Sequence, residues 1–264
     1  MTWTTDMALT PVGEHRYTAV VGEHWSSLSG AHGGVVAALA VRAAERSFQS
    51  AGAPAGSTFR SGTFGYANGN VPGELELAVD IVRQGKRMAT AQVEVTQNGK
   101  RTTLARLHFA TSSEGAAFSD IPDAPLQPAD TWKASTLAPK HFANVDTDID
   151  ASTTGFSGAP RGEWRAWSRP IDANEIDSAW LTMFGDYFPP AVFVRSTERS
   201  MPVTIEYTIQ IHKGEGSWSI SDDERLAAHM HVTHSHDGLA VEDGWVWLPN
   251  GQLLATVRQT RLAG

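Results

Sequence analysis

The chain has 264 residues, enough for one large domain or two small ones, and with 41% hydrophobic and only 19% charged residues it can build a sizeable core rather than remain disordered. Its net charge of −8 gives it no general attraction to nucleic acid or to anionic membrane surfaces. The chain has no cysteine, which excludes disulfides, thiolate metal sites and a cysteine nucleophile.

The N-terminal residues lack the basic start and apolar run of a secretory signal. No stretch approaches the roughly 20 apolar residues of a membrane span, so we expect no membrane insertion. The absence of cysteine agrees with a reducing compartment. We therefore expect a soluble, cytoplasmic protein.

The first strongly helical segment is Gly33–Phe48, where apolar residues recur on one helix face and alanine is abundant. Its two leading glycines permit close backbone approach and leave free N–H groups. After a break rich in glycine and proline, three strands are predicted around 74–81, 89–96 and 102–111. Asn98-Gly99, between the last two, is a strong hairpin signal.

A proline-containing stretch, rich in acidic and small residues, follows. It predicts a linker over residues 115–135, between an N-terminal domain of residues 1–114 and a C-terminal domain of residues 136–264.

The second half repeats the plan. A helix is predicted over Ala173–Phe184, stopped by Pro189-Pro190. Strands follow around 204–211 and 245–248, and a last strand runs through Leu262 after the turn dipeptide Asn250-Gly251.

The two halves can be aligned through Pro72 with Pro202 and through their Asn-Gly turns. The alignment matches Leu107 with Gln259 and Glu74 with Thr204, so the polar pair occurs in the second half alone. A helix followed by an antiparallel sheet, given twice, predicts a duplicated α+β unit in which two long helices pack on one continuous antiparallel sheet.

Several motifs in this order resemble one family. They are Trp25, Gly33-Gly34 leading Ala37-Ala38, the run Phe184–Ala191, Val203–Glu206, and Asn250–Ala255 followed by Gln259. The chain resembles acyl-CoA thioesterases of the thioesterase II type, and more closely the thioesterase-like superfamily proteins. This resemblance covers nearly the whole chain and implies a double hot-dog fold and hydrolysis of acyl-CoA in fatty acid and lipid metabolism.

The resemblance also implies a site in which an aspartate, a threonine and a glutamine hold a water. Residue by residue these are Asp186, Thr204 and Gln259. Thr204 is followed by Ile205-Glu206-Tyr207, where the thioesterase II type usually carries an aspartate-histidine pair, and the surroundings of Gln259 are more basic than usual.

Thioester hydrolysis needs a nucleophile, a proton acceptor and stabilisation of the oxyanion. The chain has neither a cysteine nor a G-x-S-x-G serine motif, which favours direct attack by water. Asp186 can accept the proton of the water while Thr204 and Gln259 hold it. The amides of Gly33 and Gly34 are suited to the oxyanion. The combination predicts one site per chain.

Other polar groups carry weaker hypotheses. His24 and His32 flank the predicted helix start and are candidates for lining the pocket. His32 is a candidate for substrate binding, with a capping or surface role as the alternative. Three arginines in basic turns, Arg83, Arg87 and Arg101, are candidates for the phosphates of coenzyme A, with plain surface charge as the alternative. Four histidines between 229 and 236 suggest a metal site, but a solvated hairpin near His236-Asp237-Gly238 fits better, so no metal or other cofactor is expected.

Two rival functions stay open at this point. A catalytically silent acyl-CoA-binding protein would share the fold, and a double hot-dog hydratase or dehydratase would carry a histidine near the aspartate within a helix, which neither predicted helix does. Because edge strands of such sheets tend to pair, a homodimer or a larger even homo-oligomer is expected.

Overall fold

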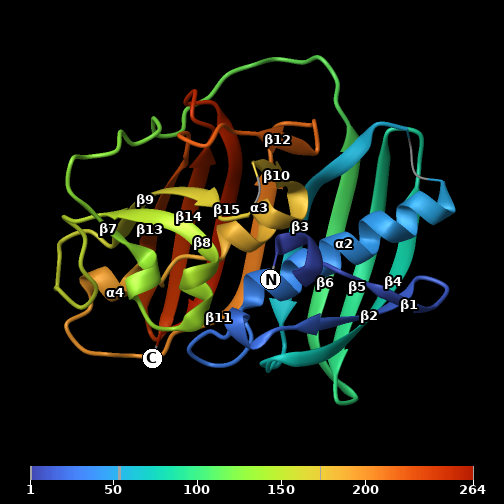
Figure 1. Cartoon of the computed structure of the whole chain (residues 1–264), viewed down its shortest axis with the longest axis horizontal. Coiled ribbons are helices and arrows are strands. Elements are labelled where there is room, and N and C mark those ends of the chain that lie inside the picture. The colour runs from blue at the N-terminus through green and yellow to red at the C-terminus, as the bar shows by residue number, and fades with distance from the viewer. Residues whose placement is uncertain (1, 53–54, 173, 264) are drawn as a thin grey trace.

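In the computed structural model, which describes residues 2–52, 55–172 and 174–263, thirteen strands form one sheet that runs the length of the molecule (Figure 1). The strand order is β1-β2-β4-β5-β6-β3-β11-β15-β14-β13-β9-β8-β7, and every described strand pair is antiparallel. The expected α+β class and the double hot-dog sheet are therefore confirmed.

The N-terminal half contributes α1 (Trp3–Asp6), β1 (Thr10–Gly13), β2 (Arg16–Val21), α2 (Gly33–Ala51), β3 (Ser57–Tyr66), β4 (Gly73–Gln84), β5 (Met88–Gln97) and β6 (Lys100–Thr111). The predicted helix extends by three residues to Ala51, where Gly52 ends it with a left-handed φ of 82°. The predicted strands at 74–81, 89–96 and 102–111 correspond to β4, β5 and β6. Strand β3 lies in the segment for which the sequence predicts an irregular break.

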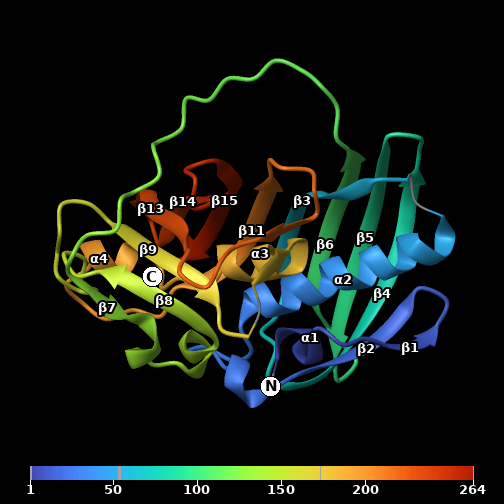
Figure 2. The same ribbon diagram turned by 45° about the horizontal axis from the view of Figure 1, so that its top comes forward.

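Residues 112–130 follow without a described helix or strand and cross to the second half as a long loop (Figure 2). The end of the predicted linker is already structured, because β7 pairs with β8.

The C-terminal half contributes β7 (Thr131–Lys133), β8 (Val145–Asp150), β9 (Glu163–Pro170), β10 (Glu175–Asp177), α3 (Ser178–Gly185), α4 (Val192–Arg195), β11 (Val203–Ile211), β12 (Ser217–Ser219), β13 (Leu226–His236), β14 (Leu239–Trp247) and β15 (Leu253–Leu262). The predicted helix Ala173–Phe184 is wrong at its start. Position 173 lies outside the described residues, and Glu175–Asp177 forms a strand paired with β12. The helix begins only at Ser178, where the Asp177 carboxylate accepts a hydrogen bond from the Trp180 amide.

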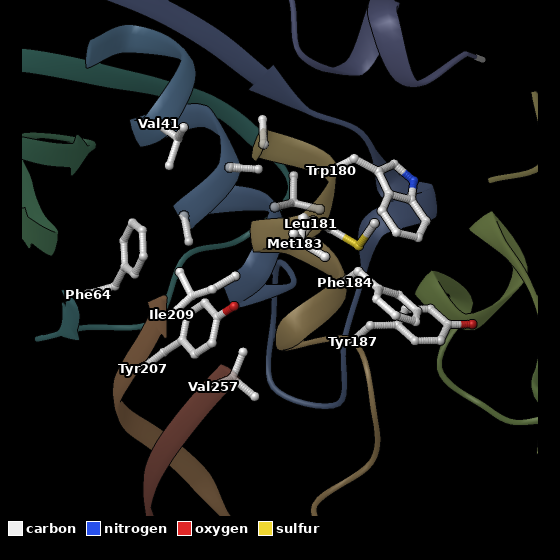
Figure 3. Packing of buried hydrophobic residues seen from close by; sticks show 14 of the residues in the cluster. Val41, Phe64, Trp180, Leu181, Met183, Phe184, Tyr187, Tyr207, Ile209 and Val257 are labelled. Atoms are coloured by element: carbon white, nitrogen blue, oxygen red, sulfur yellow. The ribbon is translucent and has the colours of Figure 1, made fainter. Parts of the chain in front are cut away.

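Helices α2 and α3 lie side by side on one face of the sheet (Figures 1 and 2). All eight residues of α3 are buried, because the helix is enclosed between the sheet and neighbouring segments. Phe184 and Tyr187 pack together next to Trp180, while Tyr207, Ile209 and Val257 rise from β11 and β15 beneath them (Figure 3). The Tyr207 hydroxyl donates to the Thr182 carbonyl oxygen at 2.9 Å and so ties α3 to the sheet.

The two halves join where β3 pairs with β11, and the ladder reveals an internal twofold relation. In each half, the strand after the helix pairs with the last strand of that half, and both pairings have an irregularity at the same place. On one side of the irregularity, Gly62 pairs with Leu107 in the first half, and Tyr207 pairs with Gln259 in the second. On the other side, Phe59 pairs with Phe109 in the first half, and Thr204 pairs with Arg261 in the second.

Thr204 therefore corresponds to Phe59, and the expected match with Glu74 is wrong. Glu74 lies in β4, a strand whose counterpart in the second half is β13. The expected match of Gln259 with Leu107 is confirmed by the strand register.

Candidate active site

Asp186 lies at the junction of two helices. It caps the C-terminus of α3, where its N–H donates to the Met183 carbonyl oxygen at 3.2 Å, and it faces the N-terminus of α2. Anions are disfavoured at a helix C-terminus and favoured at an N-terminus. The carboxylate is thus held between two helix ends of opposite polarity.

Two glycines allow this close approach. A Cβ atom added to Gly34 would lie 2.6 Å from the Met183 carbonyl oxygen and 3.0 Å from the Asp186 Cβ. A Cβ atom added to Gly33 would lie 2.9 Å from Asp186 Oδ2 and 3.2 Å from the Tyr66 hydroxyl oxygen. Gly34 is therefore required by the packing of α2 against α3, and Gly33 by the close approach of the Asp186 and Tyr66 side chains.

Burial raises the pKa of Asp186 to about 6. Its side chain has almost no contact with solvent, since the residue is only 8% exposed. The positive charge of Arg261 and hydrogen bonds from the Gly34 amide and the Gln259 side chain act in the opposite direction and limit the increase in pKa. A carboxylate with this pKa is ionised at neutral pH yet basic enough to accept a proton.

Thr204 and Gln259 come from neighbouring strands, β11 and β15. The Thr204 hydroxyl donates to Gln259 Oε1 at 3.2 Å, and Gln259 Nε2 donates to the Gly185 carbonyl oxygen at 3.4 Å. Gln259 is buried on the helix-covered face. The structure thus brings Asp186, Thr204 and Gln259 together, with Gly33 and Gly34 beside them.

His32 is buried next to the site, and its role in substrate binding stays a prediction. Its Nε2 donates to the Asp186 carbonyl oxygen at 3.1 Å, and its ring stacks on that of His141 with centroids 4.4 Å apart. It is the N-cap residue of α2, but its side chain makes no capping hydrogen bond and is only 4% exposed, so the capping and surface alternatives are both wrong. Burial lowers the pKa of His32 to about 4, so the ring is neutral at pH 7.

The three candidate arginines do not form one cluster. Arg83 and Arg87 flank the β4–β5 turn, near the C-terminal end of α2, where Gln84 donates to the Ala51 carbonyl oxygen. Since α2 has 19 residues, this end is about 28 Å from Asp186. Arg101 lies in β6, beside the opposite end of β5, and forms an ion pair with Glu94 at 2.7 Å.

Four residues of the site escaped sequence reasoning. The hydroxyl of Tyr66 is buried beside Asp186 and finds no hydrogen-bond partner among the described residues. His141 packs on His32, and Arg261 and Glu242 form an ion pair behind Thr204. None carries a local motif, although the basic surroundings of Gln259 were a signal for Arg261.

The histidine-rich strand forms the expected hairpin. His229 of β13 contacts Glu163 of β9 through Nε2 at 2.9 Å. Asp237 and Gly238, both with positive φ, form the turn from β13 to β14. Within the described residues, no three histidine or acidic side chains are arranged to hold a metal ion. None of the helices in the described ranges is long and apolar enough to cross a membrane.

Comparison with known families shows to which family the chain belongs. Residues 21–110 match the profile described as the acyl-CoA thioesterase N-terminal domain, and residues 118–263 match that of the acyl-CoA thioesterase C-terminal domain. The chain belongs to the acyl-CoA thioesterase family. A comparison of this chain with curated proteins finds no match.

Solved structures share the fold of this chain along nearly its whole length. A conserved protein of unknown function with a hot dog fold from Alicyclobacillus acidocaldarius has a TM-score of 0.83 and 20% identity, covering 98% of this chain and 97% of its own. Acyl-CoA thioesterase II TesB2 from Mycobacterium marinum has a TM-score of 0.75 and 18% identity, covering 98% and 97%. At these identities the likeness concerns the fold.

Proposed function

We propose that this thioesterase hydrolyses an acyl-CoA to a free acid and coenzyme A by direct attack of water. One observation carries the proposal. A buried carboxylate with a pKa of about 6, that of Asp186, lies against a glutamine amide and the N-terminus of a helix. This combination supplies a proton acceptor, a polar group that orients water, and the positive end of a helix dipole, which stabilises the oxyanion.

In the proposed reaction Asp186 accepts a proton from the water, whose oxygen bonds to the thioester carbonyl carbon. Gln259 and Thr204 orient that water. The carbon–sulfur bond then breaks, and Asp186 returns the proton to the departing thiolate. Because the Gly34 amide already donates to Asp186, stabilisation of the oxyanion falls to the Gly33 amide and the dipole of α2.

A catalytically silent acyl-binding protein is the second candidate, and the closure of the site favours it. Asp186 is 8% exposed, and the surface hollows beside the β1–β2 hairpin and beneath the linker do not reach it. Hydrolysis therefore requires side chains around Asp186 to move when substrate enters.

Thiol release distinguishes the two candidates. We expect the purified protein to release coenzyme A from at least one member of a panel of short-, medium- and long-chain acyl-CoA esters, and Asp186→Asn to abolish the release. Binding of an acyl-CoA without thiol release by wild-type protein would identify the silent protein instead.

For the coenzyme A phosphates we propose Arg101. Tyr66 is next to Asp186 and pairs across the sheet with Thr103, which is two residues from Arg101. Arg101 therefore lies at the end of β6 that is nearest the site. The turn that carries Arg83 and Arg87 is at the far end of α2. A single coenzyme A with its thioester at Asp186 meets one of these turns, and Arg101 is the nearer.

We also propose a homodimer or a larger even oligomer. The sheet ends at β1 and β7, and edge strands with free N–H and C=O groups pair readily. Sedimentation velocity at micromolar concentration tests this, and a purely monomeric protein would contradict it.

A further inference from the structure

Behind Thr204 lies an ion pair that the proposed chemistry does not use directly. Arg261 Nε donates to Glu242 Oε2 at 2.9 Å, and each residue is 5% exposed. The other oxygen of Glu242 accepts a hydrogen bond from the Val192 amide at 3.2 Å. Removing both charges from water is costly, and well-packed apolar residues are often at least as stabilising.

Arg261 fixes the direction of the hydrogen bonds that reach the site. Its Nη1 donates to the Thr204 hydroxyl oxygen at 2.6 Å, and a guanidinium can only donate. The single hydroxyl proton of Thr204 is therefore directed to Gln259 Oε1. As a result, the NH₂ group of Gln259 must point toward Gly185 and Asp186. Without Arg261, the Thr204 hydroxyl is free to accept from Gln259, and the amide can turn over.

The other half of the chain gives an internal comparison. Through the twofold relation, Thr204 corresponds to Phe59, Gln259 to Leu107 and Arg261 to Phe109. Glu242 pairs with Gln259 as Ala91 pairs with Leu107, so Glu242 corresponds to Ala91. All four counterparts are apolar and buried, and Phe59 and Phe109 pack edge to face. The same sheet is therefore stable with apolar residues at these positions.

We propose that Arg261 and Glu242 are positioning residues, which hold the Thr204 hydroxyl as an acceptor and thereby point the Gln259 amide at Asp186. The proposal rests on the hydrolytic function proposed above for Asp186. Glu242 holds the guanidinium, Arg261 orients Thr204, and neither touches the substrate. The Arg261 charge also favours the ionised form of Asp186.

The double variant E242A/R261F tests this, because it copies the residues Ala91 and Phe109 of the other half. We expect it to unfold at a temperature no lower than that of wild type, while kcat falls about 10²-fold with little change in KM. Arg261→Lys keeps the charge but cannot contact Glu242 and Thr204 with a rigid fork, so it should lose kcat and keep the acidic limb of the pH profile.

A matched control lies on the opposite face of the same two strands. Arg258 contacts Asp243 through two hydrogen bonds of 2.6 and 2.9 Å, and D243N/R258M should leave kcat unchanged. A folded E242A/R261F protein with kcat within threefold of wild type would overturn the proposal.

One readout does not depend on turnover. Titration of the Asp186 carboxyl by ¹³C NMR, assigned with Asp186→Asn, should move to higher pH in E242A/R261F and stay in place in D243N/R258M. If wild-type protein releases no thiol from any ester, the hydrolytic function fails, and the NMR titration still decides about Arg261. If the midpoint of the Asp186 titration were the same in the double variant as in wild type, the proposed influence of Arg261 on the site would be refuted.

Discussion

Thr63 of β3 pairs directly with Thr208 of β11, and the two halves of the chain are related by a twofold rotation about this point. The relation explains why the site is built from both halves. The N-terminus of α2 comes from the first half, whereas Asp186, Thr204 and Gln259 come from the second. It also provides a built-in comparison for every residue of the site.

Asp186→Asn should lower kcat about 10²–10⁴-fold, because asparagine keeps the shape but cannot accept the proton of the water. In wild-type protein, kcat/KM should decline as pH falls below about 6, where Asp186 becomes protonated. Steady-state kinetics across pH 4.5–8.5 measures both effects, with surface Asp237→Asn as control. A folded Asp186→Asn enzyme within a few-fold of wild type would reject water activation by this carboxylate.

The same substitution should stabilise the fold at neutral pH. The pKa of Asp186 rises from 3.8 to about 6 on folding, so between these values the folded protein keeps a proton that the unfolded chain has lost. The contribution of Asp186 to the free energy of unfolding therefore falls as pH rises between these two pKa values. Asp186→Asn should raise the free energy of unfolding by up to about 3 kcal/mol at pH 8, and should leave it unchanged below pH 3.8. Urea unfolding at pH 8 and pH 3.5 checks the difference, and an equal effect at both would contradict it.

Thr204→Ala and Gln259→Ala should each lower kcat about 10–10³-fold, less than Asp186→Asn, because they orient the water but do not exchange protons with it. The double variant should lose less than the product of the two single losses, since both serve one water. Thr208→Ala, at a half-buried position on the opposite face of the same strand, is the control. Fully multiplicative effects would indicate that the two side chains act separately.

Arg101→Ala should raise KM for acyl-CoA and reduce the dependence of KM on salt, because an exposed charge contact with phosphate is screened by ions. Arg87→Ala, at the far end of α2, should change neither quantity. Charges are screened over about two nanometres at 20 mM added salt and over about half a nanometre at 300 mM. Kinetics measured at these two salt concentrations therefore separates the two arginines. Equal behaviour of both variants would remove Arg101 from the site.

Much of the fold follows from local patterns. The alanine-rich periodicity of Gly33–Phe48 marks α2, and the Asn-Gly dipeptides mark two hairpins. Strand β3 was missed because its sequence, STFRSGTFGY, is poor in periodic apolar residues. Gly62 is needed there, since an added Cβ would lie 2.9 Å from the rings of Phe59 and Phe64. This packing depends on tertiary contacts that the sequence does not display.

The site was predictable only where family motifs marked it. Asp186, Thr204 and Gln259 were found through the resemblance, and the structure brings them together. The alternation of apolar residues has period two and fits any pair of strands, so it matched Thr204 with the wrong strand. Tyr66 and Glu242 lie outside these motifs, and only the fold brings them to the site.

The pairing of β3 with β11 has a further consequence for how such a site can evolve. In a homodimer of single hot-dog units, symmetry copies every substitution into both sites, so neither can be given up without losing the other. Joining the units by the segment 112–130 in one chain removes that constraint. One half is then free to fill its own site with Phe59, Leu107 and Phe109 and serve as rigid support, while the other specialises in chemistry.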